Sequence, residues 1–266
     1  MTPQALLDHQ DHGHLWDRPL TDQAGFGLDD AYASALAVRA LRMARGEQPR
    51  GFKIGFTNRT IWDRYNVHAP IWGSVWNTTL SLCEQEGQLS LAATCQPRLE
   101  PETVFGMRSC PAPGASLQTL FEAIEWVAPG FEIVQSHLPD WKFLPADTVA
   151  DGALHARLLV GRRIPVDQVA SDAAELDALL ARATVTLSRD GQRIDHGAGA
   201  HVLDSPLRAL HHFLPALRAC PGAPDVQAGD VVTTGTWTDA WPVAPGERWT
   251  ACFSAPLGTL TATFSD

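Results

Sequence analysis

Apolar residues recur with helical spacing in several stretches of the chain. The clearest spans residues 31–45, between the acidic pair Asp29 and Asp30 and Gly46. Acidic residues favour the start of a helix and glycine its end. The apolar stripe of this predicted helix consists of Tyr32, Leu36, Ala40 and Met43. Helices are also predicted over residues 58–67, 117–127 (ending before Pro129-Gly130), 171–182 and 205–215, and a serine marks the start of each of the last three.

Much of the remaining chain alternates apolar and polar residues, which is the period of a strand. Residues 52–56 show it most clearly, with Lys53 between Phe52 and Ile54. Weaker alternation over residues 75–95 predicts strands and a hairpin. Asp190-Gly191 predicts the turn of another hairpin. Further strands are expected over residues 98–107, 131–135, 158–161, 229–237, 249–254 and 258–264.

Composition is that of a large globular protein. The chain has 266 residues, of which 45% are hydrophobic and 19% charged. It is long enough for one large domain, or for a domain with a smaller lobe. Nine tryptophans and nineteen prolines favour a β-rich body with many loops. Residues 1–27 are polar and hold His9, His12 and His14, and they are expected to form a mobile terminus rather than a metal site.

Charge and cysteine content narrow the class of protein. The net charge is −10, and no cluster of lysine and arginine is interleaved with aromatic residues, which argues against a nucleic-acid partner. No apolar run reaches eighteen residues, and the N-terminus lacks a signal-peptide layout, so no membrane association is expected. Five cysteines without metal-type spacing favour free thiols in the cytoplasm.

Glu100 and Glu102 are the first candidate site. On an extended backbone residues i and i+2 point to the same face, so the two carboxylates should converge. Like charges at such a distance need compensation, which a bound cation, a shared proton or water at an exposed edge could supply. Pro101 between them removes a backbone donor, which predicts a sheet edge or a bulge. A third carboxylate, Glu132, lies in the apolar run at 131–135 and favours the cation.

Two further stretches could bind a ligand. Lys53 is followed by Ile54-Gly55 on a predicted strand, so its side chain either faces a ligand or is solvated. The 229–237 strand runs into a turn at Thr234, Gly235 and Thr236. Hydroxyl groups and free backbone N–H groups at such a turn can hold a carboxylate.

These motifs occur together in one known family. Six motifs follow one another along the chain in this order: Gly51-Phe-Lys53-Ile-Gly-Phe-Thr57, Arg98-Leu-Glu100-Pro-Glu102, Phe131-Glu132-Ile-Val, Asp140-Trp141, Asp147-Thr-Val-Ala-Asp151 and Gly229-Asp-Val-Val-Thr-Thr-Gly-Thr236. From about Leu28 to Phe264 the chain resembles the 2-keto-4-pentenoate hydratase / 4-oxalocrotonate decarboxylase family of the fumarylacetoacetate hydrolase superfamily.

The resemblance implies an α+β fold, with a mixed rolled β-sheet core, peripheral helices and an N-terminal helical lobe. The lobe with the Lys53 strand is expected over residues 1–75 and the catalytic domain over 76–266. The resemblance also implies a divalent metal, Mg²⁺ or Mn²⁺, bound by Glu100, Glu102 and Glu132. Lys53 is the implied catalytic residue, and the implied substrate-binding residues are Thr57, Trp72, Trp141, Thr234, Gly235 and Thr236.

The chain departs from the family pattern near the site. Gln135-Ser136-His137 and Gly152-Ala153-Leu154-His155 replace stretches where relatives carry an arginine and an amide. His155 or His137 could act as a general acid or base, although a purely structural role is the more common one for such a histidine, and His155 is the catalytic candidate. Pro70-Ile71-Trp72-Gly73 lacks an acid often found there, which predicts a bulkier or less polar substrate tail.

The expected activity is that of a metal-dependent hydratase acting on a 2-hydroxy-dienoate or related 2-oxo acid in aromatic breakdown. A 2-oxo-acid decarboxylase and an acylpyruvate-type hydrolase are alternatives, because one electron sink serves all three reactions. A non-catalytic 2-oxo-acid-binding subunit is a further alternative. The family also implies a homo-oligomer and, for some members, a pathway enzyme as partner.

Overall fold

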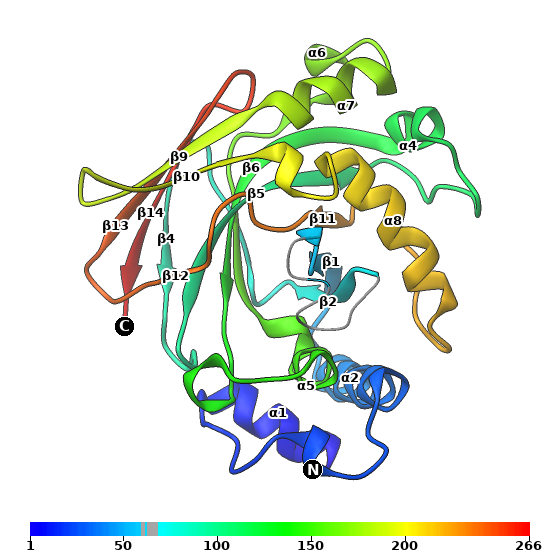
Figure 1. The fold of residues 1–266 in the computed structure, drawn as a ribbon, viewed down its shortest axis with the longest axis vertical. Coiled ribbons are helices and arrows are strands. Elements are labelled where there is room, and N and C mark those ends of the chain that lie inside the picture. The colour runs from blue at the N-terminus through cyan, green and yellow to red at the C-terminus, as the bar shows by residue number, and fades with distance from the viewer. Residues whose placement is uncertain (60–61, 63–68) are drawn as a thin grey trace.

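The computed structural model describes residues 1–59, 62 and 69–266 (Figure 1). The short helix predicted over residues 58–67 falls mainly outside the described residues. Two β-sheets form the centre, and helices cover them on two sides. This arrangement is the α+β fold with peripheral helices that the sequence led us to expect.

The larger sheet holds the strands that carry the candidate residues. Its order is β2-β1-β11-β5-β6-β7-β3, with β12 beside β5 and β8 beside β6. These strands are β1 (Pro49–Gly55), β2 (Ile71–Trp76), β3 (Leu80–Leu82), β5 (Arg98–Met107), β6 (Ile124–Val134), β7 (His155–Val160), β8 (Ile164–Pro165), β11 (Val231–Thr233) and β12 (Trp241–Pro242). Its longest pairing is the antiparallel ribbon of β5 and β6.

The smaller sheet has the order β10-β9-β13-β14-β4. It consists of β4 (Glu86–Ser90), β9 (Thr184–Arg189), β10 (Gln192–Ala198), β13 (Arg248–Phe253) and β14 (Thr259–Ser265). The predicted hairpin around Asp190-Gly191 and the closing strand pair are both confirmed. Buried aromatic side chains, among them Trp237, Trp249 and Phe253, join this sheet to the main core.

The helices form two groups at different ends of the molecule (Figure 1). One group comprises α4 (Leu117–Ala123), α6 (Val166–Val169), α7 (Ala173–Arg182) and α8 (Pro206–Ala219). The other comprises α1 (Pro3–His12), α2 (Leu28–Ala44) and α5 (Pro145–Ala150). Single turns of 3₁₀ helix lie at η1 (Leu20–Asp22), η3 (Pro139–Trp141), η4 (Gly152–Leu154) and η5 (Gly199–His201).

The N-terminal segment is ordered, so the expectation of a mobile terminus was wrong. Thr2 caps α1 through its side chain, and Gly13 ends the helix in the left-handed region. Leu6, Leu7 and Trp16 are buried in a core shared with α2 and α5. These few apolar residues fix a segment whose overall polarity suggested otherwise.

One hairpin expectation and one helix expectation also needed correction. Residues 75–95 do not form a hairpin, because β3 pairs with β7 in the larger sheet while β4 pairs with β14 in the smaller one. The helix expected to reach residue 127 ends at Ala123, and β6 continues through Pro129-Gly130. Ile124, Val127 and Ala128 are buried there by strand pairing rather than by a helix face.

Both prolines of the β5–β6 ribbon lie in gaps between short neighbouring strands. Pro101 falls between the residues that pair with β12 and those that pair with β11, and Pro129 falls between β8 and β7. The carbonyl groups of Pro101 and Pro129 accept hydrogen bonds from Trp237 and Gly161 on these outer sides. Each missing N–H therefore faces a gap. β5 has neighbours on both sides, so the expected edge position was wrong, although the proline does mark a break in the pairing.

The predicted division at residue 75 falls within β2. This strand pairs with β1, and β1 pairs with β11, so the Lys53 strand belongs to the large sheet. Division of the chain into residues 1–75 and 76–266 remains a prediction.

Candidate metal centre and active site

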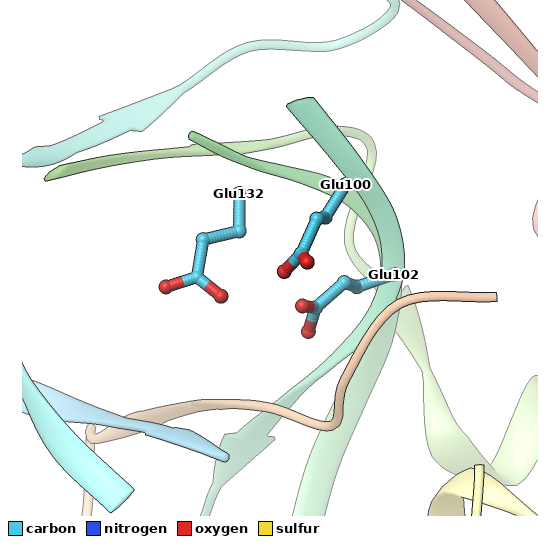
Figure 2. A group of neighbouring side chains, drawn as sticks. All are labelled: Glu100, Glu102 and Glu132. Carbon is cyan, nitrogen blue, oxygen red and sulfur yellow. The ribbon is translucent and has the colours of Figure 1, made fainter. Parts of the chain in front are cut away.

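Three carboxylates meet on the β5–β6 ribbon. Glu100 and Glu102 share one face of β5, and the strand register places Glu132 directly opposite Glu100. One carboxylate oxygen from each residue lies within 4.8 Å of the others. Figure 2 shows the three side chains converging on one point. The predicted convergence of these glutamates is therefore confirmed in its geometry.

The charges around this point are unbalanced. Glu102 and Glu132 have no exposed surface, and Lys53, only 3% exposed, places its Nζ 3.3 Å from Glu132 Oε2. Burial raises the pKa of Glu100 to about 8, against the opposing effect of Lys53. Burial alone would lower the pKa of Lys53, but the neighbouring carboxylates outweigh it and the pKa is raised. Three acids thus face one ammonium group.

The donor set fits a hard divalent cation. Glu102 Oε1 is buried and has no hydrogen-bond partner among the described residues. An uncompensated carboxylate oxygen in a protein interior is costly unless a cation or water meets it. Carboxylate oxygens are the ligands that Mg²⁺ and Mn²⁺ prefer. The residues present could therefore hold such a metal.

The glycine turn after β11 supports Glu102. The Gly235 N–H donates to Glu102 Oε2 over 2.7 Å, and the Thr234 hydroxyl donates to the Thr103 carbonyl over 2.9 Å. Gly235 has φ +101°, and a Cβ there would lie 1.9 Å from Thr57 Oγ1. Position 235 therefore requires glycine for two reasons: the backbone has a positive φ, and Thr57 leaves no room for a Cβ. The fully buried Thr234 shapes the turn, whereas Gly235 and Thr236 reach the cavity described next.

A cavity of about 560 Å³ opens beside the carboxylates. Among the predicted residues, its lining includes Lys53, Thr57, Glu100, Trp141, Gly235 and Thr236. Phe143, Trp241 and Ile71 add apolar surface. The guanidinium group of Arg98 lies 4.3 Å from the centre of the Trp141 ring. A volume of this size and a mixed lining suit a small organic ligand.

Trp72 does not line this cavity, which corrects its predicted substrate-binding role. In the register of β1 and β2 it lies opposite Ile54, on the face away from Lys53. Its ring stacks on Tyr32 at 4.9 Å and is almost completely buried. Ile71, one residue earlier, points to the cavity instead.

His155 lies behind Glu132 rather than in the cavity. Its Nδ1 is 2.8 Å from Glu132 Oε1 and its Nε2 is 2.8 Å from Thr79 Oγ1. Burial, together with the charges of Lys53 and two arginines, lowers the pKa of His155 well below its usual value. This position favours a supporting role over the predicted acid–base role. His137 is also buried, 2.6 Å from Asp151, and away from the cavity lining.

Sequence reasoning missed several cavity residues. Arg98 lies two residues before Glu100 and shares its face of β5, so alternation could have identified it. Phe143, Asp239 and Trp241 come from loops and a short strand. Their approach depends on the folded chain path, and no local pattern signals it.

Comparisons with known proteins identify the family. No family model matches the chain. The chain is 35% identical over 253 residues to 2-hydroxyhexa-2,4-dienoate hydratase of Comamonas testosteroni, covering 93% of this chain and 90% of the relative. The chain belongs to the 2-keto-4-pentenoate hydratase / 4-oxalocrotonate decarboxylase family. A 4-oxalocrotonate decarboxylase of Pseudomonas sp. is 31% identical, over 84% of this chain and 81% of the relative.

A solved structure of the same family agrees in fold. The 4-oxalocrotonate decarboxylase from Pseudomonas putida G7, complexed with magnesium and adipate, has a TM-score of 0.88 and 26% identity. The alignment covers 98% of this chain and 95% of that one. The resemblance and the fold class expected from the sequence are thus confirmed. None of the described helices combines the length and apolar composition that a membrane span requires.

Proposed function

We propose that the chain is a divalent-metal-dependent hydratase of a 2-hydroxy-dienoate or 2-oxo-alkenoate. The observation that carries this proposal is the group of three converging carboxylates beside a cavity that also exposes Lys53. The similarity to a 2-hydroxyhexa-2,4-dienoate hydratase supports the reaction type. Glu100, Glu102 and Glu132 would hold Mg²⁺ or Mn²⁺, and the related decarboxylase crystallised with magnesium supports this ligand class.

The metal, when bound, supplies a Lewis acid for the carboxylate and C2 oxygen of a 2-oxo acid. Lys53 remains protonated beside Glu132 and places a positive charge on the cavity wall. Its Nζ–H groups can donate to negative charge that develops on substrate oxygen. Thr236 and Thr57 line the wall near the glycine turn and can orient the acid end of the substrate.

The rest of the cavity suits the substrate tail. Trp141, Phe143 and Trp241 offer apolar and aromatic surface that displaces water from a hydrocarbon chain. Arg98, held against Trp141, adds one cation to this wall. A tail with limited polarity therefore fits best.

The alternative within the family is a 2-oxo-acid decarboxylase. The high structural similarity to a 4-oxalocrotonate decarboxylase favours it, and the same carboxylates and lysine could serve loss of CO₂. An acylpyruvate-type hydrolase would use the same electron sink. A non-catalytic binding subunit is less well supported, because Lys53 and Glu100 line the cavity and the carboxylates of Glu102 and Glu132 converge on that of Glu100.

Assembly and location are part of the proposal. The family supports a small-molecule substrate, a homo-oligomer and, for a decarboxylase, a pathway enzyme as partner. Five free cysteines support a reducing, cytoplasmic location.

The test is a product assay with a panel of 2-oxo acids, in EDTA and with added Mg²⁺ or Mn²⁺. Hydratase activity predicts water addition without CO₂ release, only with metal, while CO₂ release from a dicarboxylic substrate would select the decarboxylase. Glu100→Gln should remain folded by circular dichroism and lose metal binding. Metal-independent turnover would overturn the mechanism.

A further inference from the structure

We infer that His155, held by Thr79, is a positioning residue that orients Glu132 as a metal ligand from the side opposite the substrate cavity. The inference rests on the metal site of the proposed function. It concerns how this chain holds one ligand, and it assigns His155 a role without contact to substrate.

A break in strand register brings His155 to Glu132. On β6 and β7, Glu132 pairs with Leu158 and Ile133 with Arg157, but Val134 pairs with His155. Ala156 is therefore an extra residue on β7. In unbroken pairing His155 would share the face of Arg157, and the extra residue transfers it to the face of Glu132. Bulges beside active sites commonly re-aim a side chain in this way.

The hydrogen bonds define one tautomer. Thr79 Oγ1 accepts from the Trp76 N–H over 3.1 Å, and its own proton is available to His155 Nε2 at 2.8 Å, closer than the Trp76 carbonyl at 3.3 Å. A carboxylate that binds a metal is ionised and only accepts hydrogen bonds, so in that state the proton of the ring lies on Nδ1 and points to Glu132 Oε1. A neutral donor fixes the carboxylate without cancelling the charge that a cation needs.

The hydrogen bond from His155 determines which oxygen of Glu132 is left to face the carboxylates of Glu100 and Glu102. Oε1 is engaged by His155, while Oε2 lies on the side of Lys53. Figure 2 shows the carboxylate turned toward Glu100 and Glu102. Without His155 the carboxylate could rotate, and one buried oxygen would lose its partner. Loss of such outer-sphere partners typically weakens metal affinity by about 10–100-fold.

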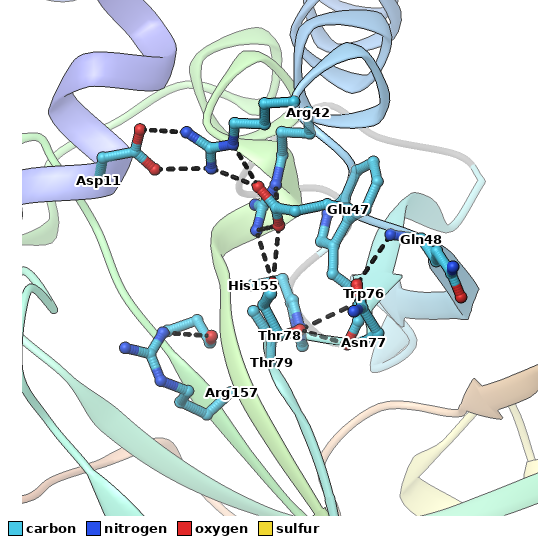
Figure 3. A network of polar contacts seen from close by, with 12 residues as sticks. Asp11, Arg42, Glu47, Gln48, Trp76, Asn77, Thr78, Thr79, His155 and Arg157 are labelled. Carbon is cyan, nitrogen blue, oxygen red and sulfur yellow. Dashed lines mark hydrogen bonds and ion pairs between the residues drawn. The ribbon is translucent and has the colours of Figure 1, made fainter.

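His155 also borders a second cavity, of about 310 Å³. The lining of this second cavity also includes Thr79, Arg42 and Arg157, which Figure 3 shows near His155. It gives small molecules from solution a route to the position of the ring that does not pass through the substrate cavity. The positioning role can therefore be tested by chemical rescue.

The first experiment measures Mn²⁺ affinity by electron paramagnetic resonance and calorimetry. His155→Leu should bind Mn²⁺ about 10–100-fold more weakly than wild type. His155→Asn, whose side-chain amide can donate from nearly the position of Nδ1, should recover most of that loss. Thr79→Val should weaken binding, whereas Thr79→Ser should not. His137→Asn changes another buried histidine beside a carboxylate, Asp151, and should leave Mn²⁺ affinity unchanged.

The second experiment adds imidazole to folded His155→Ala. Imidazole should restore Mn²⁺ affinity to the variant and give no gain in wild type. This comparison is made within one protein, so it does not depend on differences in folding. Unchanged affinity in folded His155→Leu, or the same loss in His155→Asn as in His155→Leu, would overturn the inference while leaving the proposed function intact. A wild-type protein that binds no Mn²⁺ would overturn the proposed function itself.

Discussion

Two ionic clusters lie on either side of β7, and they differ in how their charges are matched. On one side, Lys53 is the only lysine or arginine among the described residues that forms an ion pair with Glu100, Glu102 or Glu132, although Arg98 also lowers the pKa of Glu100. On the other, the network in Figure 3 joins two acids to two guanidinium groups, in the residues Asp11, Arg42, Arg45 and Glu47. The first cluster is largely buried and short of positive charge, whereas the second is balanced and partly exposed.

The pKa of Glu47 in the balanced cluster and the pKa of Glu100 in the unbalanced cluster shift in opposite directions. Burial alone would raise the pKa of Glu47, but hydrogen bonds from Arg42 and Thr78 lower it. The pKa of Glu100 is raised to about 8 by burial despite Lys53. The balanced cluster matches its charges without a ligand, while the unbalanced one is where we propose that a metal binds. The following predictions separate these two behaviours.

Lys53→Met should have the largest effect on the metal-free protein. Among the described residues, Lys53 carries the only ammonium or guanidinium group that forms an ion pair with one of the three converging glutamates. Leaving buried charges uncompensated costs about 3–5 kcal/mol of unfolding free energy. Urea denaturation in EDTA measures this loss, and saturating Mn²⁺ should recover part of it. Equal stability of variant and wild type in EDTA would contradict the charge imbalance.

Glu102→Gln should act in opposite directions on binding and on stability. The amide oxygen can still accept from the Gly235 N–H, and the substitution removes a carboxyl group whose pKa burial raises well above its ordinary value. Mn²⁺ affinity should fall at least about 100-fold, while the metal-free protein gains about 1–2 kcal/mol at a pH where this carboxyl is ionised. Calorimetry measures the first quantity and denaturation in EDTA the second. A variant that loses stability in EDTA would show that the carboxylate serves the fold.

Gly235→Ala should weaken both the turn and the metal site. A left-handed φ and a Cβ 1.9 Å from Thr57 Oγ1 predict a cost of about 1–3 kcal/mol. The shift of the Gly235 N–H should also lower Mn²⁺ affinity. Gly246→Ala is the matched control, since its φ is +86° and no atom lies within 4 Å of the added Cβ. It should cost less and leave Mn²⁺ binding unaltered; similar binding losses in both variants would point to a general effect.

Arg45→Ala should have the smallest effect. Its side chain is 39% exposed and bridges Asp11 and Glu47. Screening by solvent limits such pairs to about 0.5–1 kcal/mol. Thermal unfolding at low and high salt should show a loss that shrinks with salt, without a change in Mn²⁺ affinity. A large change in affinity would mean that the balanced cluster takes part in the metal site.

Local periodicity was enough to predict part of the site. The i, i+2 spacing of Glu100 and Glu102 gives their shared face directly. Glu132 is different, because strand register decides that it lies opposite Glu100, and only the resemblance to known enzymes supplied that information. The same limit applied to Lys53. Alternation predicted the strand that carries it but not whether its side chain faces a ligand or solvent.

Other features depend on tertiary structure. Trp72 was expected at the substrate, yet pairing with β1 places it in the core. His155 reaches Glu132 through one extra residue in β7, which sequence alternation does not reveal. Pro129-Gly130 resembled a helix end but lies within β6. The strand tolerates Pro129 because the proline, which has no N–H, faces the gap between β8 and β7. In each case a non-local neighbour overrode the local signal.

The three carboxylates and one part of the cavity wall come from different kinds of structure. All three carboxylates lie on the long β5–β6 ribbon, whereas Trp141, Phe143 and Asp239 come from segments between the main strands. Such segments tolerate replacement better than paired strands do. During evolution this part of the wall can therefore change to fit new substrate tails, while the ribbon and the carboxylates on it are kept.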